Sequence, residues 1–486
     1  MTNISPPTHE LRSAMTDVAT LIDQKQWQNA LEKLSNLKKW HPGHPHVLHL
    51  LGVVKQELGD RKGAMEALSQ AVTLAPDNHL FQLDLGLALK QKGAHLPAQD
   101  RLHEVLRLNP ACAAAHFHLG DLWMDQGQID AAIQSFQQAL HHQPDLLEAW
   151  INLGLCQKSQ NRIEEAVTSF QTARRLQPDH AQTHVNLAMA LLMQGDYAPG
   201  WRAYEWRFRL DQPSLPFALP QVPRWQGEAL TGKTILLLGE QGFGDQIQFI
   251  RFADSLNQQG ARVLVAVPGP LVTLLQRAPG VAKVQDHLEF QEPVDCFSPL
   301  LSVAGLLGVT ADTIPATTGY LSVDPVLSEI WRERLHGTEF KVGLIWQGKP
   351  LHANDPLRRR SCTRQDLTPL AAIPGVQLFS LQKGANDPPD DLPITSLESE
   401  LTDFAATAAI MTQMDLIISI DTAAAHLAGA LGKPVWTLLP RAPDWRWGSH
   451  QATTPWYGTM RLFRQSVTDQ WQEPVLAMAE ELKKRP

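Results

Sequence analysis

The sequence predicts an array of helical repeats followed by an α/β region built on two parallel sheets. Small residues and prolines recur with a fixed period of 34 residues through the first 200 or so positions. Two series of short apolar segments, separated by glycine-rich loops and amphipathic stretches, follow a proline-rich stretch in the second half. At 486 residues the chain is also too long for one hydrophobic core. We therefore expect several domains.

Composition places the chain among ordinary globular proteins. Apolar residues make up 43% and charged residues 19%, and the formal net charge of -8 argues against nucleic acid as the main partner. The four cysteines are scattered without a CxxC pair, which favours reduced thiols over disulfides or a zinc site. The N-terminal segment lacks the features of a secretory signal, and no run of about 18 apolar residues occurs. These features predict a cytoplasmic protein without a membrane span.

The period of 34 residues is carried by three residue types. The recurring positions are Pro42, Pro76, Pro110, Pro144 and Pro178; Gly52, Gly86, Gly120 and Gly154; and Ala30, Ala64, Ala98, Ala132 and Ala166. Small side chains let the two helices of a hairpin approach closely, and a proline ends the second helix. Such a period is typical of stacked helical hairpins. We expect about five hairpins over residues 11–180 and an imperfect last pair to about residue 210.

A leucine-glycine pair marks the first helix of each hairpin, from Leu51-Gly52 to Leu153-Gly154, and weakens to Leu187-Ala188. With the period, this pattern resembles the tetratricopeptide repeat (TPR), an α-solenoid whose groove binds extended peptides or protein tails. The resemblance implies that the polar residues just before each leucine line this groove. They are Asp84, His118, Asn152 and Asn186. These residues are either peptide-binding groups or ordinary polar positions on a solvated face.

An aromatic segment and a proline-rich segment end the helical half. Trp201, Tyr204, Glu205 and Phe208 fall on one face of a helix predicted over residues 195–208, which we expect to seat the next domain. The following prolines predict an extended connector. We therefore place the solenoid at 11–210, the connector at 211–227, a first lobe at 228–330 and a second lobe at 335–486.

Residues 227–234, GEALTGKT, match the P-loop pattern, but we reject that interpretation. A phosphate-binding P-loop leaves a strand and opens a helix. Here the motif precedes an apolar strand.

The second half predicts two Rossmann-like lobes. In the first lobe a strand at 235–239, a glycine loop that opens a helix, and a strand at 262–267 form a parallel β-α-β unit. In the second lobe, strands are predicted at 341–346, 376–382, 415–420 and 434–439. Ligands of such sheets bind at the carboxyl ends of the strands, so the loops after these strands are the candidate site.

The loop after the strand at 415–420 carries the strongest signal. Asp421 and Thr422 end the strand, the small residues Ala423 and Ala424 open a helix, and His426 follows one turn later. A helix N-terminus with small residues favours a diphosphate, although capping alone is the alternative. The motif resembles the DTGxxH motif of heptosyltransferase-like GT-B glycosyltransferases, which contacts the nucleotide diphosphate. Ala423 stands where that motif has glycine.

This resemblance implies roles for two further loops. After the strand at 341–346, it places near Arg360 and Ser361 the cation that would neutralise the leaving nucleotide without a metal, with Arg358 or Lys349 as alternatives. In the first lobe Asp245 would be the catalytic base, with N-capping as its alternative role. The rest of that loop, Glu240, Gln241, Gly242 and Gly244, would face the same cleft.

The order of the parts resembles that of O-linked N-acetylglucosamine transferases and bacterial TPR-linked flagellin glycosyltransferases. It implies an inverting transfer of a sugar from a nucleotide-sugar to a protein acceptor, such as flagellin, held by the solenoid, with no cofactor or metal. One alternative is a transferase acting on a saccharide, as in lipopolysaccharide synthesis, and another is a non-catalytic adaptor. Tryptophans in the segment 440–465 are expected to pack in the core, with stacking on a base or sugar as the alternative.

Overall fold

The computed structural model describes residues 8–211, 215–315, 318–348, 360–384 and 392–485. The chain forms two compact units: Met1–Gln157 with Arg175–Pro178, and Lys158–Arg174 with Asp179–Pro486. We call them the first and second units. None of the helices in the described ranges is long and apolar enough to cross a bilayer.

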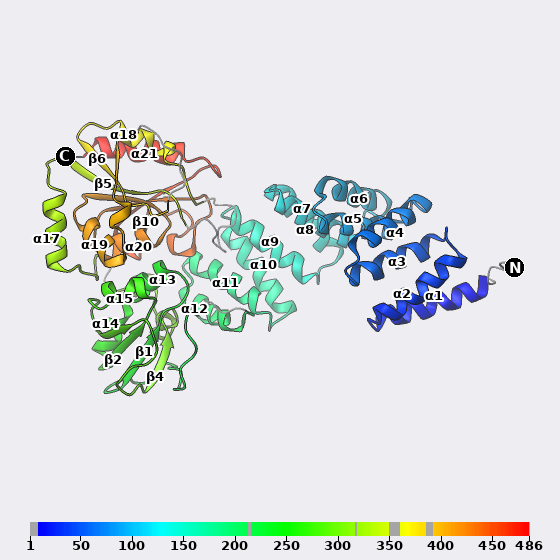
Figure 1. The fold of residues 1–486 in the computed structure, drawn as a ribbon, viewed down its shortest axis with the longest axis horizontal. Coiled ribbons are helices and arrows are strands. Elements are labelled where there is room, and N and C mark those ends of the chain that lie inside the picture. Colours follow the sequence, from blue (N-terminus) through cyan, green and yellow to red (C-terminus); the bar gives the residue numbers. More distant parts are fainter. Residues whose placement is uncertain (1–7, 212–214, 316–317, 349–359, 385–391, 486) are drawn as a thin grey trace. The chain divides into compact units, whose positions relative to one another are not determined.

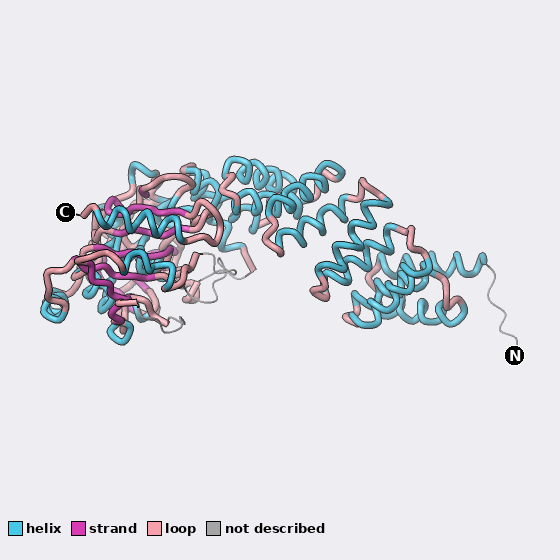
Figure 2. The backbone as a smooth tube through the Cα atoms, turned by 90° about the horizontal axis from the view of Figure 1, so that it is seen from above, coloured by secondary structure: helices cyan, strands magenta, loops and turns pink. Residues whose placement is uncertain are grey.

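The repeats are antiparallel helical hairpins, and Figure 2 shows only helices and loops along them. The helices are α1 (Thr8–Asp23), α2 (Trp27–Trp40), α3 (Pro45–Glu57), α4 (Arg61–Leu74), α5 (His79–Gln91), α6 (His95–Leu108), α7 (Ala113–Asp125), α8 (Ile129–His142), α9 (Leu147–Ser159) and α10 (Ile163–Leu176). A side chain added at Gly52 would lie 2.6 Å from Leu68 Cγ, and one at Gly120 would lie 2.6 Å from a ring carbon of Phe136. The period therefore reflects close packing within each hairpin, and the predicted solenoid is confirmed.

Two further helices, α11 (Ala181–Gln194) and α12 (Tyr197–Tyr204), belong to the second unit. Trp201 of α12 is buried and donates from Nε1 to the Val309 carbonyl at 2.9 Å. The expected packing of this aromatic segment against the α/β part is confirmed. The regular helix ends at Tyr204, however, and a 3-10 helix η1 (Glu205–Arg209) follows. Phe208 therefore leaves the face of Trp201, and its ring contacts the guanidinium groups of Arg207 and Arg224.

The first lobe is a four-stranded parallel sheet in the order β3-β2-β1-β4. Its elements are β1 (Thr234–Leu238), α13 (Phe243–Phe249), α14 (Phe252–Gln258), β2 (Arg262–Ala266), α15 (Gly269–Leu275), β3 (Val281–Gln285), β4 (Cys296–Pro299), α16 (Ser302–Leu306) and the 3-10 helix η2 (Ala311–Thr313). The P-loop-like segment ends at Thr234, the first residue of β1, so the strand follows the motif. The rejection of a P-loop is confirmed.

The second lobe is a seven-stranded sheet in the order β10-β11-β9-β8-β5-β6-β7, parallel except for the pair β10–β11. Its strands are β5 (Phe340–Ile345), β6 (Val376–Ser380), β7 (Ile394–Ser396), β8 (Leu416–Ile420), β9 (Val435–Leu439), β10 (Thr453–Thr454) and β11 (Tyr457–Arg464). Its helices are α17 (Pro325–Arg334), η3 (Gln365–Leu367), α18 (Thr368–Ala371), η4 (Glu398–Glu400), α19 (Phe404–Thr412), α20 (Ala423–Ala430), η5 (Trp445–Trp447) and α21 (Gln472–Lys483). The C-terminal α21 closes one face of this sheet: Val475, Met478 and Leu482 join a core that includes Val342 and Leu344 of β5.

The two lobes meet through α13 and α20, whose labels lie side by side between the two sheets in Figure 1. Helix α13 follows the carboxyl end of β1, and α20 follows the carboxyl end of β8. The strand-end loops singled out in the sequence are therefore neighbours in the fold.

Candidate functional site

Gly244 sets the distance between the two loops. A side chain added at Gly244 would lie 2.7 Å from His426 Cδ2 and 3.3 Å from Ala423 Cα. Both distances are too short for an ordinary Cβ, so the bare backbone of the first-lobe loop is needed at this point. The glycine loop and the start of α20 are thus neighbours, and their binding of a ligand stays a prediction.

The start of α20 has the chemistry of an anion site. Thr422 is the N-cap residue, and its hydroxyl lies 3.2 Å from that of Ser419 rather than capping the helix. Ala423 and Ala424, in the first turn, are partly exposed. Backbone N–H groups at a helix start carry partial positive charge and are not covered here by large side chains.

His426 is buried beneath this turn and is uncharged. Burial, with the positive charges of Arg446 and Arg251, lowers the pKa of His426 well below its usual value. Its Nδ1 lies 2.9 Å from the hydroxyl of Tyr457, and burial raises the pKa of that hydroxyl, which keeps its proton. When Tyr457 donates to Nδ1, Nε2 carries the imidazole proton. His426 therefore offers a neutral N–H donor rather than a cation.

Asp245 makes both a capping contact and a contact between the lobes. Its Oδ2 accepts a hydrogen bond from the Gly242 amide at 2.9 Å, so the capping role exists. Its Oδ1 forms an ion pair with Arg446 of the second lobe. Burial raises the pKa of Asp245, Arg446 opposes this rise, and Asp444 adds to it. The role of Asp245 as a base stays a prediction.

Arg446 is the main residue that sequence reasoning missed. It lies in η5, in the loop after β9, and is buried. Besides Asp245, it donates to Asp444 at 2.7 Å and to the Gln248 side-chain oxygen at 2.5 Å. The strand-end rule, applied to the strand predicted at 434–439, would have pointed to this loop. In this loop the sequence singles out only the tryptophans. No local sequence pattern predicts that an arginine pairs with a residue 201 positions away.

Arg360 reaches the same site from the loop after β5. Its Nη1 lies 3.5 Å from the Asp421 carbonyl oxygen, while the Ser361 hydroxyl accepts from the Gly348 amide at 3.1 Å. Arg358 and Lys349 lie outside the described residues. Burial raises the pKa of the Asp421 carboxyl to about 6, and Asp444 contributes. Within the described ranges, no three His, Cys, Asp or Glu side chains are grouped so as to hold a metal ion.

Glu240 and Gln241 are held by the end of the helical segment. Both carboxylate oxygens of the buried Glu240 accept from Arg207, each at 2.9 Å, and one also accepts from the Leu301 amide. Gln241, in a left-handed backbone conformation with φ of 56°, donates to the Tyr204 hydroxyl at 2.6 Å. These contacts fix the shape of the loop that leads to Asp245.

The predicted groove residues make polar contacts with residues of the repeats. In the first unit Asp84 lies 2.5 Å from His49, and Asp121 accepts from Asn152 at 2.8 Å and lies 3.7 Å from His118. In the second unit, Asn186 accepts from Gln182 at 3.0 Å. The contacts of Asp84 with His49 and of Asp121 with Asn152 link the first helices of successive hairpins, and His118 and Asp121 lie in the same helix, α7. Whether these residues bind a peptide stays a prediction.

The tryptophans of the segment 440–465 pack in the core, as expected. Trp445, Trp447 and Trp456 are all buried. Trp447 also stacks on His426 with ring centroids 5.2 Å apart. The segment therefore forms one wall of the site.

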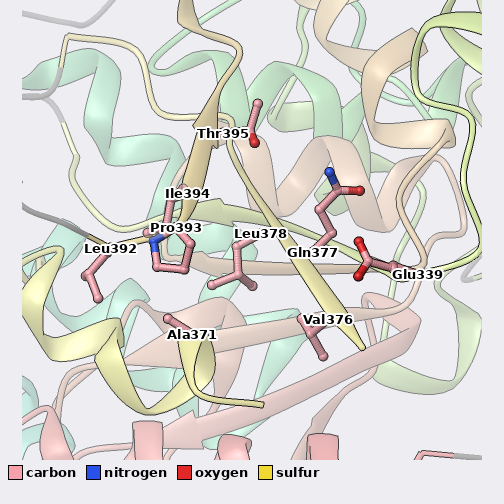
Figure 3. Close-up of a pocket in the computed structure, with 9 residues that line it drawn as sticks. All are labelled: Glu339, Ala371, Val376, Gln377, Leu378, Leu392, Pro393, Ile394 and Thr395. Atoms are coloured by element: carbon pink, nitrogen blue, oxygen red, sulfur yellow. The ribbon is translucent and has the colours of Figure 1, made fainter. Parts of the chain in front are cut away.

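A pocket of about 430 Å³ lies elsewhere in the second lobe. Figure 3 shows its lining, which comes mainly from β6, β7 and the residues next to them, with Glu339 and Ala371 at its sides. None of the predicted site residues lines it. The pocket is therefore an alternative location for a ligand.

Comparison with known proteins shows similarities in both parts of the chain. Tetratricopeptide-repeat families match residues 45–78, 98–146 and 124–182, and glycosyltransferase family 9 (heptosyltransferase) matches residues 395–470. The last range contains the start of α20 and Arg446. Protein FlbA of Caulobacter vibrioides is 30% identical over 317 residues, covering 58% of this chain and 51% of FlbA. The chain thus spans about half the length of that relative.

Several solved structures are similar to a part of the chain. MamA from Desulfovibrio magneticus RS-1 is 19% identical, with a TM-score of 0.33, and covers 36% of this chain and 99% of MamA. Pseudomonas aeruginosa pilF is 15% identical, with a TM-score of 0.38, and covers 41% and 89%. The family matches and the two parallel sheets thus make the chain similar to tetratricopeptide-repeat proteins in its first part and to glycosyltransferase family 9 over residues 395–470.

Proposed function

We propose that the protein is a glycosyltransferase that moves a sugar from a nucleotide-sugar to a protein acceptor held by the repeats. The observation that carries the proposal is the close approach of Gly244 to Ala423 and His426. It brings the neighbouring Asp245, a candidate base, to the start of α20, a candidate anion site, from the opposite lobe. The family 9 match over residues 395–470 supports the same reaction class.

In the proposed mechanism, the donor diphosphate binds at the first turn of α20. The helix amides, Arg360 and the neutral Nε2–H of His426 stabilise the charge that develops on the leaving nucleotide, without a metal. Asp245 accepts the proton of the acceptor hydroxyl, whose oxygen attacks the anomeric carbon opposite the nucleotide. The bond from that carbon to the phosphate oxygen breaks, so the configuration inverts.

The repeats support a polypeptide acceptor, flagellin being the example that the domain order implies. Their first helices carry the polar residues Asp84, His118, Asn152 and Asn186, which offer hydrogen-bonding groups of the kind that an extended peptide needs.

A thermal-shift screen against UDP, GDP, ADP, CDP and dTDP tests the donor site. A ligand that binds the native state raises the melting temperature by mass action. We expect one nucleotide to give a selective shift that His426→Ala and Arg360→Ala remove. His450→Ala, at an exposed histidine of the same lobe, is the control and keeps the shift.

The non-catalytic adaptor is the second candidate, and the two contacts of Asp245 favour it. A carboxylate that caps α13 and pairs with Arg446 already has a structural role. The adaptor predicts that none of the five nucleotides shifts the melting temperature of the wild-type chain, a result that contradicts the transferase.

A further inference from the structure

We infer that Arg446 is a second cation for the donor diphosphate, and that Asp245 and the diphosphate compete for its guanidinium group. The inference rests on the proposed donor site at α20. It adds Arg446, which lies outside the motif at residues 421–426, and the competition for its guanidinium group.

Arg446 is placed by contacts from both lobes. Its Nε donates to Gln248 and its Nη2 pairs with Asp245, both of α13 in the first lobe. Its Nη1 donates to Asp444, the N-cap residue of its own 3-10 helix. A guanidinium has five N–H donors, and these three contacts leave further N–H groups for another acceptor.

The guanidinium lies close to the first turn of α20. Gly244, next to Asp245 in the chain, touches Ala423 and His426. On the other side Trp447, next to Arg446, stacks on the His426 ring. Asp421 and His426, which flank this turn, both feel the charge of Arg446: burial raises the pKa of Asp421 and Arg446 opposes the rise, whereas burial lowers the pKa of His426 and Arg446 adds to the fall.

The balance of charge and hydrogen bonds at Arg446 favours exchange of its partner. Three carboxylates, those of Asp245, Asp421 and Asp444, surround Arg446 and Arg360. A diphosphate matches the planar fork of a guanidinium as well as a carboxylate does, and it carries more charge. The buried side-chain nitrogen of Gln248 has no acceptor among the described residues. A phosphate oxygen beside Arg446 would supply that acceptor.

The competition links the donor to the base. Arg446 opposes the rise in the pKa of Asp245 that burial causes. When the diphosphate takes the guanidinium, Asp245 loses this stabilisation of its charged form and becomes a stronger base. Donor binding would then prepare Asp245 to accept the proton of the acceptor hydroxyl.

Isothermal titration with UDP, GDP, ADP, CDP and dTDP tests the inference on the full chain. Arg446→Gln is expected to weaken binding by about 10- to 100-fold, the usual effect of a lost hydrogen bond to a charged group. Asp245→Asn is expected to tighten binding by a few-fold, because the guanidinium is released and one negative charge is removed. The double variant is expected to bind like Arg446→Gln. Arg461→Gln, which removes an exposed arginine of the same lobe, is the control and leaves the affinity unchanged.

Three results would overturn the inference. If Arg446→Gln and Asp245→Asn weaken nucleotide binding equally, the pair acts by holding the two lobes together. An unchanged affinity in Arg446→Gln, with binding lost in His426→Ala, would leave the proposed donor site standing without Arg446. No binding of any nucleotide to the wild-type chain would refute the donor site and this inference together. If Arg446→Gln does not fold, tightening in Asp245→Asn supports the inference and weakening overturns it.

Discussion

Glu240 and Asp245 lie five residues apart in one segment, and each forms an ion pair with a buried arginine. The two pairs differ in the number of hydrogen bonds that the carboxylate makes. Glu240 accepts two hydrogen bonds from Arg207 and one from the Leu301 amide, and Arg207 also donates to Ser302 at 2.8 Å. Asp245 has one contact with Arg446, which it shares with Asp444 and Gln248. The first pair joins the end of the helical segment to the first lobe, and the second pair joins the two lobes.

This difference distinguishes a carboxylate that fixes a backbone segment from one that we propose to take part in the reaction. A buried pair with parallel hydrogen bonds is costly to break and fixes a backbone segment. A buried carboxylate next to another carboxylate, with its pKa raised, is typical of a functional site. The segment 240–245 thus has a structural end at Glu240, and its other end carries Asp245, which we propose as the base.

The largest effect is expected for Glu240→Gln. The change leaves the buried charge of Arg207 without its main partner and should lower the free energy of unfolding of the second unit by about 3 kcal/mol. Urea denaturation followed by tryptophan fluorescence measures it. The control, Glu205→Gln, removes a partly exposed partner of Arg207 and should cost clearly less. A loss below about 1 kcal/mol for Glu240→Gln would mean that the pair does not hold the segment.

Gly244→Ala should have the next largest effect. Its Cβ would lie 2.7 Å from His426 Cδ2, so α13 and α20 must move apart at a cost of about 2 kcal/mol. Urea denaturation measures this cost, and titration should show weaker nucleotide binding. In the control Gly269→Ala, the nearest atom to the Cβ is 3.8 Å away. Equal stability of the two variants would contradict the close approach of the lobes.

Asp421→Asn should stabilise the chain in a pH-dependent way. Burial raises the pKa of Asp421 from 3.8 to about 6, so the folded chain binds a proton that the unfolded chain has already lost between these values. This contribution to stability is present below pH 4 and is lost as the pH rises to 6. The neutral asparagine should therefore be more stable than the wild type above pH 7 and about equally stable near pH 4. Thermal melts across this range measure the gain, and a gain independent of pH would contradict the shift.

The smallest effect is expected at an exposed pair. Arg461 and Glu481 lie 3.1 Å apart on the surface, where water screens the attraction. Glu481→Gln should leave the urea midpoint unchanged within error. A clear fall in the urea midpoint would show that exposed ion pairs stabilise the chain as much as buried ones do. The comparison of the Glu240 and Asp245 pairs would then lose its basis.

The sequence predicted the fold well because its signals are local. The 34-residue period reports the packing of the two helices of a hairpin, as in the fit of Gly52 against Leu68 and of Gly120 against Phe136. Six strands of the two lobes were predicted from short apolar runs, and the start of α20 from its small residues. The strands β3, β4, β7, β10 and β11 were not predicted.

The site was predicted only in part, because its remaining contacts join distant segments. Arg446 and Asp245 are 201 residues apart, and Arg207 and Glu240 are 33 apart. The sequence predicted that Glu240 and Asp245 both face the cleft. In the structure, Glu240 is buried against Arg207. Only the packing of the two lobes and of the last helices distinguishes the two carboxylates.

Hydrogen exchange measured by mass spectrometry, with and without the nucleotide that stabilises the chain, tests the central claim most directly. The account predicts that protection on binding is concentrated in peptides that cover residues 240–249, 421–431 and 444–457. Protection confined to peptides that cover residues 376–378 and 392–395, which line most of the pocket in Figure 3, would place the ligand elsewhere and contradict the account.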